Sequence, residues 1–257
     1  MMNLVDIFNN HNGYSTDKWE QYLYIYNLEF ANIVNRNKPV DLLEVGVANG
    51  GSLELWKKFL PENSNIYGMD INPECKNIEY QEPIKCFIGD ARKKEDLESF
   101  FPEQKFDIII DDGSHICPDV IADFENLFPM LKNGGIYIIE DVHASYWKYW
   151  KGGFKRKNTT IEYFKNFADA VNCDHVLKNP PAFFNKKEKN LLLELNKHVA
   201  SVTFYDSVIV VKKFVKEKTS PFRNIVTGEI YPVAEFPFSD EVKMPVKKEN
   251  NLFSELN

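Results

Sequence analysis

The chain has 257 residues with 38 acidic and 31 basic side chains, which gives a formal net charge of -7 at pH 7. This acidic balance argues against nucleic acid as the main partner, although a local basic patch remains compatible with it. Apolar residues make up 44% of the chain, as in ordinary globular proteins, and the length suits one large α/β domain with additions.

Cysteine usage and hydropathy set further bounds. The four cysteines, Cys75, Cys86, Cys117 and Cys173, are scattered without the close pairs of a zinc site or a redox motif. The N-terminus shows no signal-peptide pattern, and no apolar run is long enough to span a membrane. We therefore expect reduced thiols, a cytoplasmic location and no membrane insertion.

Residues 1–37 predict a helical segment ahead of the main domain. Ser15-Thr16-Asp17 offers a helix N-cap, and apolar side chains then recur at helical spacings over residues 19–34. One interpretation is that this helix packs an aromatic face on the sheet. The other is that residues 16–18, including Lys18, close over a bound cofactor together with Tyr22.

Residues 40–60 indicate a strand, a glycine-rich turn and a helix. The stretch Val40–Val45 leads into a turn containing Gly46, Gly50 and Gly51, and helical spacing follows over residues 53–60. Glycine lets the backbone approach a ligand closely, and a helix N-terminus supplies unpaired N–H groups. Such a turn alone is weak evidence, because ordinary turns also contain glycine.

Two further predicted strands each end in an acidic residue, which strengthens the case for a cofactor. Residues 65–69 end in Asp70, at roughly the twenty-residue offset that recognition of ribose hydroxyls uses. Residues 84–88 end in Gly89-Asp90-Ala91. A nicotinamide dinucleotide is disfavoured, because its turn requires Gly-x-Gly-x-x-Gly and the glycines here are spaced differently.

Two more predicted strands end in paired acids. The stretch Phe106–Ile110, rich in β-branched residues, indicates a strand buried on both faces, and it stops at Asp111-Asp112-Gly113-Ser114-His115. Residues 135–139 likewise stop at Glu140-Asp141. Ligands collect at the carboxyl ends of strands in parallel α/β sheets, so Asp112, Glu140 and Asp141 should converge there and repel one another.

A hard divalent cation would relieve this repulsion. Mg2+ prefers oxygen ligands and keeps some of its waters, with Mn2+ as a further candidate, whereas softer metals would need Cys or several His residues. His115 follows Asp112 closely and could take a proton from a hydroxyl group whose pKa the metal lowers. His143 is the alternative base or a supporting residue. The competing interpretation is that the acids cap helices and pair with lysines.

Residues 146–157 carry aromatic and then basic side chains, with Gly152-Gly153 as a potential hinge. Aromatic rings beside an active site suit stacking on a sugar, and loops of this kind often form lids. The basic residues suit an anionic substrate such as a nucleotide-activated sugar. The alternative is a solvated loop over a local aromatic core.

The rest of the chain contains predicted structural elements but no further candidate site residues. It is expected to contain two helices and an antiparallel strand pair, at residues 92–101, 160–171, 200–204 and 208–211. Asn179–Phe183 is expected to be an extended loop because of its prolines. The charged and proline-broken residues 214–257 predict an extended arm that could clamp another subunit.

The motifs at the strand ends resemble those of the class I S-adenosylmethionine-dependent methyltransferases. The resemblance implies a doubly wound, Rossmann-like α/β sheet of seven strands with an antiparallel terminal hairpin. It also implies that Glu44, Gly46 and Gly50 surround the methionine part of the cofactor. Asp70 would hold the ribose hydroxyls, and Asp90 would meet the adenine amino group. The further contacts expected for this cofactor are Lys18, Tyr22, Asn49, Ser52, Ile71, Ala91 and Asp111.

A narrower resemblance is to the metal-dependent sugar O-methyltransferases that act on macrolide antibiotics. It rests on Asp112-Gly113-Ser114-His115, Glu140-Asp141, Ser145-Tyr146-Trp147, Thr16–Trp19 and Ser201–Ser207. A related branch contains cephalosporin hydroxylases and rhamnosyl O-methyltransferases. The resemblance implies a metal ion on Asp112, Glu140 and Asp141, with His115 as the general base. His143, Tyr146 and Trp147 are expected to contact the substrate.

The sequence therefore predicts transfer of a methyl group from S-adenosylmethionine to a sugar hydroxyl, assisted by Mg2+. The sugar would belong to a nucleotide-activated sugar, a surface polysaccharide or a natural product. The alternatives are a catechol-type O-methyltransferase for small aromatic acceptors and a non-catalytic, cofactor-binding scaffold subunit. The expected organisation is a lid over residues 1–37, a catalytic domain over residues 38–213 and an arm over residues 214–257 that supports a homo-oligomer.

Overall fold

The computed structural model describes residues 3–178, 186–222, 227–228, 230 and 233. The chain divides into two units, Met1–Glu217 and Lys218–Asn257, and the sheet lies in the first. The predicted loop at Asn179–Phe183 and most of the predicted arm lie outside the described residues. None of the described helices combines the length and the apolar character that a membrane crossing requires.

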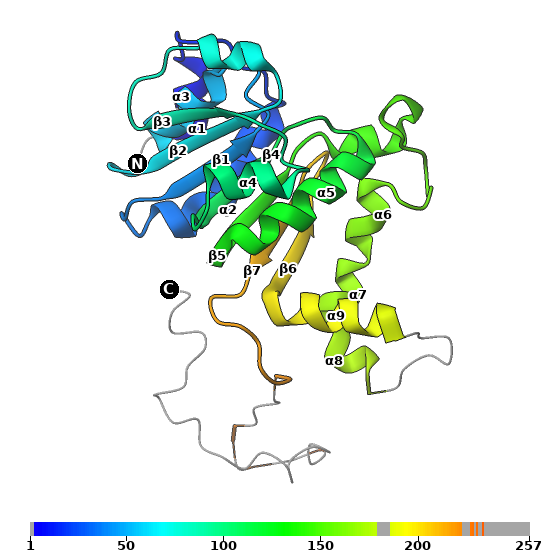
Figure 1. Ribbon diagram of the computed structural model, residues 1–257. Coiled ribbons are helices and arrows are strands. Elements are labelled where there is room, and N and C mark those ends of the chain that lie inside the picture. The colour runs from blue at the N-terminus through cyan, green and yellow to red at the C-terminus, as the bar shows by residue number, and fades with distance from the viewer. Residues whose placement is uncertain (1–2, 179–185, 223–226, 229, 231–232, 234–257) are drawn as a thin grey trace. The chain divides into compact units, whose positions relative to one another are not determined.

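A seven-stranded sheet forms the centre of the first unit (Figure 1). Its strands are β1 (Asp41–Val45), β2 (Asn65–Asp70), β3 (Ile84–Ile88), β4 (Phe106–Asp111), β5 (Leu131–Ile139), β6 (Val199–Phe204) and β7 (Ile209–Lys213). They lie in the order β3-β2-β1-β4-β5-β7-β6. The first five strands pair in parallel, and β7 pairs antiparallel with β5 and β6. The predicted α/β sheet with an antiparallel terminal hairpin is confirmed.

Helices cover both faces of this sheet (Figure 1). The α-helices are α1 (Leu4–Asn9), α2 (Glu20–Val34), α3 (Gly51–Phe59), α4 (Lys94–Phe100), α5 (Cys117–Leu127), α6 (Thr160–Lys165), α7 (Phe167–Val171), α8 (Cys173–Val176) and α9 (Lys186–His198). Short 3-10 helices are η1 (Pro73–Asn77), η2 (Phe128–Met130), η3 (Val142–Tyr146) and η4 (Lys148–Trp150).

Successive side chains along each strand point to opposite faces of the sheet, which divides the interior into two cores. Ile108 and Ile110 of β4 pack with α1, α2 and α3 on one face, whereas Ile109 packs with α4, α5, α6 and α7 on the other. All three side chains are fully buried. A strand buried on both faces needs no polar alternation, which explains the continuous apolar stretch in the sequence.

The strand order places the loops after β1, β4 and β5 side by side. The chain moves outward from β1 through β2 to β3 and then returns to β4 on the other side of β1. Val45 is in register with Asp111, and Asp111 with Ile139. This reversal is the topological switch point at which open α/β sheets bind ligands.

Three of the expected boundaries are wrong. Ser15-Thr16-Asp17 does not cap a helix: α2 begins at Glu20, its N-cap Trp19 makes no side-chain cap bond, and residues 15–19 have no regular secondary structure. The helix expected over residues 160–171 is interrupted at Asn166, between α6 and α7. The strand β5 begins at Leu131 rather than at Gly135, because Leu131 already pairs with Phe106 of β4.

A buried acid lies beneath the carboxyl end of β4. Asp123 of α5 is 4% exposed, and its Oδ1 atom has no hydrogen-bond partner among the described residues. Burial, reinforced by the neighbouring Asp111, raises the pKa of Asp123 to about 9. This carboxyl group is therefore protonated at neutral pH.

Asp123→Asn should flatten the pH dependence of stability. An unfolded aspartate ionises near pH 4, whereas folded Asp123 keeps its proton, so wild-type stability should fall as the pH rises from about 4 to 9. The neutral amide removes this contribution, which amounts to up to about 1.4 kcal/mol per pH unit. Urea unfolding at several pH values measures the slope. Asp169→Asn at an exposed acid of α7 is the control, and equal slopes in wild type and Asp123→Asn would contradict the prediction.

Candidate functional site

A buried lysine lies among three carboxylates at the carboxyl ends of β1, β4 and β5. The Nζ atom of Lys18 is 2.5 Å from Asp112 Oδ2, 2.8 Å from Glu140 Oε1 and 3.5 Å from Glu44 Oε1. The Lys18 side chain is only 2% exposed. Burial alone would lower the pKa of Lys18, but attraction by Glu140, then Asp112 and Glu44, holds this pKa well above its usual value. Lys18 is therefore a permanent positive charge within the site.

Hydrogen bonds from side chains of α2 and α3 hold two of these acids, Glu140 and Glu44, in place. The hydroxyl of Tyr26 on α2 donates to Glu140. The Oγ atom of Ser52 and the Nε1 atom of Trp56, both on α3, donate to Glu44 Oε2 at 2.8 and 2.9 Å. Ser52, expected to contact the cofactor, thus holds Glu44, an acid near the carboxyl end of β1.

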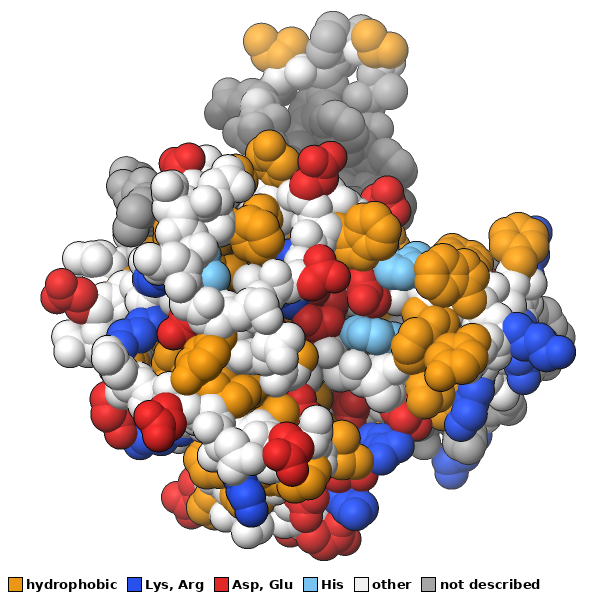
Figure 2. Space-filling view, turned by 90° about the horizontal axis from the view of Figure 1, so that it is seen from above, with side chains coloured by type: hydrophobic (Ala, Val, Ile, Leu, Met, Phe, Trp, Pro, Cys, Tyr) orange, Lys and Arg blue, Asp and Glu red, His pale blue; other side chains and the backbone are white. Residues whose placement is uncertain are grey.

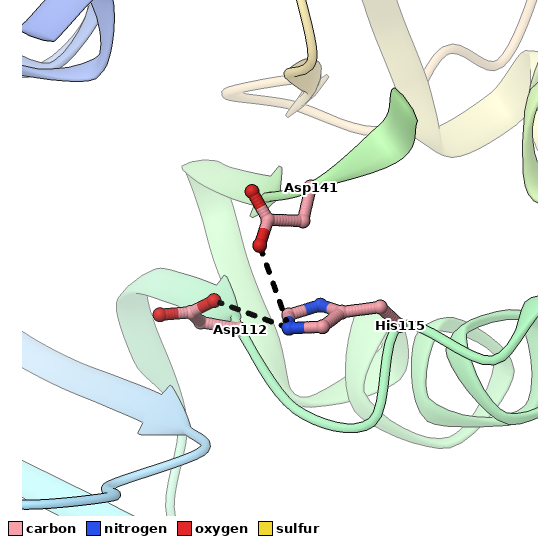
Figure 3. Close-up of side chains that lie close together, drawn as sticks. All are labelled: Asp112, His115 and Asp141. Carbon is pink, nitrogen blue, oxygen red and sulfur yellow. Dashed lines mark ion pairs between the residues drawn. The ribbon is translucent and has the colours of Figure 1, made fainter. Parts of the chain in front are cut away.

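A second, more open group consists of Asp112, His115 and Asp141 (Figure 3). The Nε2 atom of His115 lies 3.5 Å from Asp141 Oδ2 and 3.9 Å from Asp112 Oδ1. His115 and Asp141 both have positive φ angles, 55° and 51°, a conformation that is rare outside glycine and concentrates at functional sites. The three side chains are between 20 and 27% exposed, so a ligand can reach them.

The predicted metal ligands belong to two neighbouring groups. Among the described residues, the sets whose ligand atoms all lie within 4.8 Å of one another are Asp112, His115 and Asp141, and Glu44, Asp112 and Glu140. Asp112 belongs to both sets, whereas Glu140 faces Lys18 and Asp141 faces His115. Carboxylate oxygens are the donors that Mg2+ prefers, so both sets fit its chemistry. A single site on Asp112, Glu140 and Asp141 stays a prediction.

Hydrogen bonds link Asp141 to the hairpin between β6 and β7. The hydroxyl of Tyr22 donates to Asp141 Oδ1 at 2.7 Å and lies 2.8 Å from the Oγ atom of Ser207. Ser207 Oγ in turn lies 2.5 Å from His143 Nδ1. Tyr22, expected at the cofactor, and His143, expected at the substrate, are therefore both placed around Asp141.

The glycine turn is in contact with the acid loop. Gly46 has a φ angle of +89°, and a Cβ atom there would clash with the backbone oxygen of Asp112. Gly50 has a φ angle of +86°, and a Cβ atom there would clash with the Tyr80 hydroxyl, which is buried without a hydrogen-bond partner among the described residues. An unpartnered hydroxyl beside a glycine turn fits a polar ligand at this turn.

The acids that end β2 and β3 differ in how freely they can meet a ligand. Asp70 Oδ2 accepts the backbone N–H groups of Val47 and Ala48, and the neighbouring Ile71 is 63% exposed. A fixed carboxylate beside an exposed apolar side chain suits a nucleoside. Asp90 instead forms a two-pronged ion pair with Arg92, which lowers the pKa of Asp90. This pairing supports a structural role for Asp90, and its contact with adenine stays a prediction.

The remaining expected cofactor contacts lie around the same strand ends. Asn49 is exposed on the glycine turn, Ala91 is buried after β3, and Asp111 is buried at the end of β4. The Asp111 carboxylate accepts a hydrogen bond from Tyr137 at 3.4 Å, and burial raises its pKa to about 7. No contact with a ligand follows from these positions alone.

Tryptophan rings border the two histidines. Trp150 meets His115 edge-on with ring centroids 5.7 Å apart, and Trp147 meets His143 edge-on at 4.7 Å. Trp19 approaches His143 from another side at 5.8 Å. Trp147 is 54% and Tyr146 43% exposed. Figure 2 shows acidic side chains next to histidine side chains, with apolar and then Lys and Arg side chains beyond them.

Sequence reasoning missed the roles of three residues of this site. They are Tyr26, Tyr80 and Ser207. Tyr26 follows Tyr22 by one helical turn, so helical spacing could have placed its hydroxyl at the same strand end. Ser207 could have been found from the antiparallel pairing of β7 with β5, which brings the hairpin beside residue 140. Tyr80 lies in an irregular segment and carries no comparable signal.

Comparisons with known proteins agree with this architecture. Residues 43–142 match a family described as a methyltransferase domain. The chain is 32% identical over 169 residues to 8-demethyl-8-alpha-L-rhamnosyl tetracenomycin-C 2'-O-methyltransferase of Streptomyces olivaceus, which covers 62% of this chain and 43% of that protein. It is 35% identical over 156 residues to mycinamicin VI 2''-O-methyltransferase of Micromonospora griseorubida. This match covers 56% of this chain and 38% of that protein.

A solved structure shares the fold over most of the chain. It is MycE methyltransferase from the mycinamycin biosynthetic pathway in complex with Mg and SAH, with a TM-score of 0.68 and 27% identity. The match covers 83% of this chain and 55% of that one. The chain spans less than half the length of the curated relatives that it matches.

Lys18→Met should destabilise the protein in a way that magnesium offsets. Removing one partner of a buried ion pair costs roughly 3–5 kcal/mol, and Asp112 and Glu140 would then lack a cation. Thermal unfolding in EDTA and in added Mg2+ measures both effects.

The matched control is Lys132→Met. Lys132 also bridges two carboxylates, Asp41 at 2.7 Å and Asp107 at 2.8 Å, but it is 37% exposed and lies outside the site. Loss of the Lys132 charge should lower the stability of the protein by less than loss of the Lys18 charge does. Added magnesium should not restore the stability of Lys132→Met. Equal stability of the two variants in EDTA would contradict the assigned role of Lys18.

Proposed function

We propose that the chain is an S-adenosylmethionine- and Mg2+-dependent O-methyltransferase acting on a sugar hydroxyl, and the match of residues 43–142 to a methyltransferase domain supports this proposal. One observation carries the proposal: a histidine near two carboxylates lies on the loop whose Asp112 backbone meets Gly46 of the glycine turn, at the sheet's switch point. The turn suits the methyl donor, and the histidine suits deprotonation of an acceptor. The name of one relative, an O-methyltransferase for a rhamnosyl tetracenomycin, supports the same acceptor class.

The residues that would hold S-adenosylmethionine surround the turn after β1. Glu44, Gly46 and Gly50 would receive its methionine part, and Asp70 would receive its ribose. The orphaned Tyr80 hydroxyl and the exposed Ile71 support a nucleoside ligand here. When bound, this cofactor supplies a methyl group that is activated by a positively charged sulfur.

Asp112 and Asp141 would hold Mg2+, with Glu140 as the third ligand once Lys18 no longer neutralises it. The carboxylates present an oxygen-rich surface that is partly open to solvent. A metal ion at such a place lowers the pKa of a hydroxyl group bound to it.

His115 is the residue that moves the proton. Its side chain is 20% exposed, and its Nε2 atom, which lies near Asp112 and Asp141, can accept the hydrogen of an acceptor hydroxyl. Asp141 and Asp112 lie within 3.9 Å and would stabilise the imidazolium that forms. Trp147 and Trp150, beside the histidines, would orient a sugar ring by stacking.

The other predictions are retained as parts of this proposal. They are a lid formed by residues 1–37, an oligomerising arm formed by residues 214–257 and a cytoplasmic location. A small aromatic acceptor, as in catechol-type enzymes, is less well supported because the relatives are named for O-methylation of a rhamnosyl tetracenomycin and of mycinamicin VI. A scaffold subunit would have no use for a base held between two acids.

His115→Ala should lower methyl transfer by roughly 10²–10⁴-fold, the usual contribution of a general base, while S-adenosylmethionine still binds. Methylation of a panel of free, glycosidic and nucleotide-linked sugars can be followed by mass spectrometry, and cofactor binding by calorimetry. His175→Ala, at an exposed histidine of α8, is the matched control. Unchanged transfer by His115→Ala, or full wild-type activity after thorough EDTA treatment, would refute the mechanism.

A further inference from the structure

A surface beside the site carries an excess of positive charge. Residues 142–161 contain no acidic residue, although the whole chain has a net charge of -7. The segment contains five basic residues, all exposed: Lys148, Lys151, Lys155, Arg156 and Lys157. None of them takes part in an ion pair within the described part of the chain. We call residues 146–157 the basic loop.

The basic loop is a defined structure. The backbone N–H of Gly152 donates to Trp147 O at 2.9 Å, and that of Gly153 donates to Ser145 O at 2.8 Å. A Cβ atom on Gly152 would clash with the backbone oxygen of Ser145. The glycine pair thus closes a tight loop, and the positive charges are presented from a fixed support.

The same loop borders the catalytic histidine. Its Trp150 ring touches His115, and Tyr149 packs edge-on against Trp150 with ring centroids 5.0 Å apart. Lys148 and Lys151 flank this aromatic pair in the sequence. A ligand whose sugar lies at His115 would therefore extend past the aromatic rings onto positive charge, in the order that Figure 2 shows.

We infer that the acceptor is a sugar linked to a nucleoside diphosphate, with the sugar at His115 and the diphosphate on the basic loop. This inference rests on the proposed methyltransferase function and names its substrate class. Phosphate oxygens match several closely spaced cations. Exposed rings at Tyr149, 86% exposed, and Phe154, 76% exposed, offer flat faces on which a nucleobase can stack.

This acceptor class differs from what the relatives' names describe. Those names place the methylated sugar on tetracenomycin or mycinamicin. Neither name includes a phosphate group. The basic loop would thus be the part of this chain that selects its own acceptor.

The test compares two triple variants of the full-length protein. Lys148→Ser, Lys151→Ser and Lys155→Ser together remove three charges from the basic loop. Lys38→Ser, Lys189→Ser and Lys216→Ser remove the same charge from exposed lysines elsewhere. Binding of UDP and GDP by calorimetry, without any methyl donor, is the first readout. The affinity for UDP and GDP should fall by about tenfold or more in the loop variant, because the loss of one charge-assisted hydrogen bond alone has an effect of this size. In the control variant the affinity should stay constant.

Methyl transfer to matched acceptors is the second readout. Wild type should methylate a nucleoside-diphosphate sugar with a higher kcat/KM than the methyl glycoside of the same sugar, and the loop variant should lose this preference. Equal UDP and GDP binding by both variants would overturn the inference, as would a preference for a polyprenyl-diphosphate sugar. Methylation of glycosides without any preference would leave the methyltransferase function intact while refuting the acceptor class.

Discussion

The buried ammonium group of Lys18 is the charge on which the arrangement of the site depends. Three strand ends deliver acids to one place, and carboxylates that close to one another would raise each other's pKa and separate without a counter-charge. Lys18 supplies that charge from residues 15–19, which have no regular secondary structure. The loss of helix at these residues is therefore explained by the ion pairs that their lysine makes across the sheet.

The sheet determines which residues can meet at this charge. Because β1 and β4 are neighbours at the point where the strand order reverses, the glycine turn and the acid loop emerge together. The antiparallel strand β7 then brings its hairpin, with Ser207, beside the end of β5. Residues far apart in sequence thus surround Asp112 and Asp141.

The strands and the acids that follow them could be predicted because both signals are local. The stretch Phe106–Ile110 is apolar throughout, and the polar residues begin where it ends. The partners of Lys18 could not be predicted, since Asp112 and Glu140 lie 94 and 122 residues away in the chain. The same limit explains the erroneous N-cap at Ser15-Thr16-Asp17, where favourable capping residues are overridden by distant ion pairs. Glu140 pairs with Lys18 and Asp141 with His115. This division also depends on side-chain packing, which the spacing of residues in the sequence does not reveal.

The close approach of Gly46 to the backbone of Asp112 has a consequence for how this sequence can diverge. It joins the glycine turn, the proposed donor side, to the loop of Asp112 and His115, the proposed base side, so neither can shift without disturbing the other. The charged side chains of the basic loop are exposed, so they can be exchanged without disturbing that contact. Under the proposed function, a new acceptor can thus be acquired in evolution through these surface positions, while the contact between the turn and the acid loop is inherited unchanged.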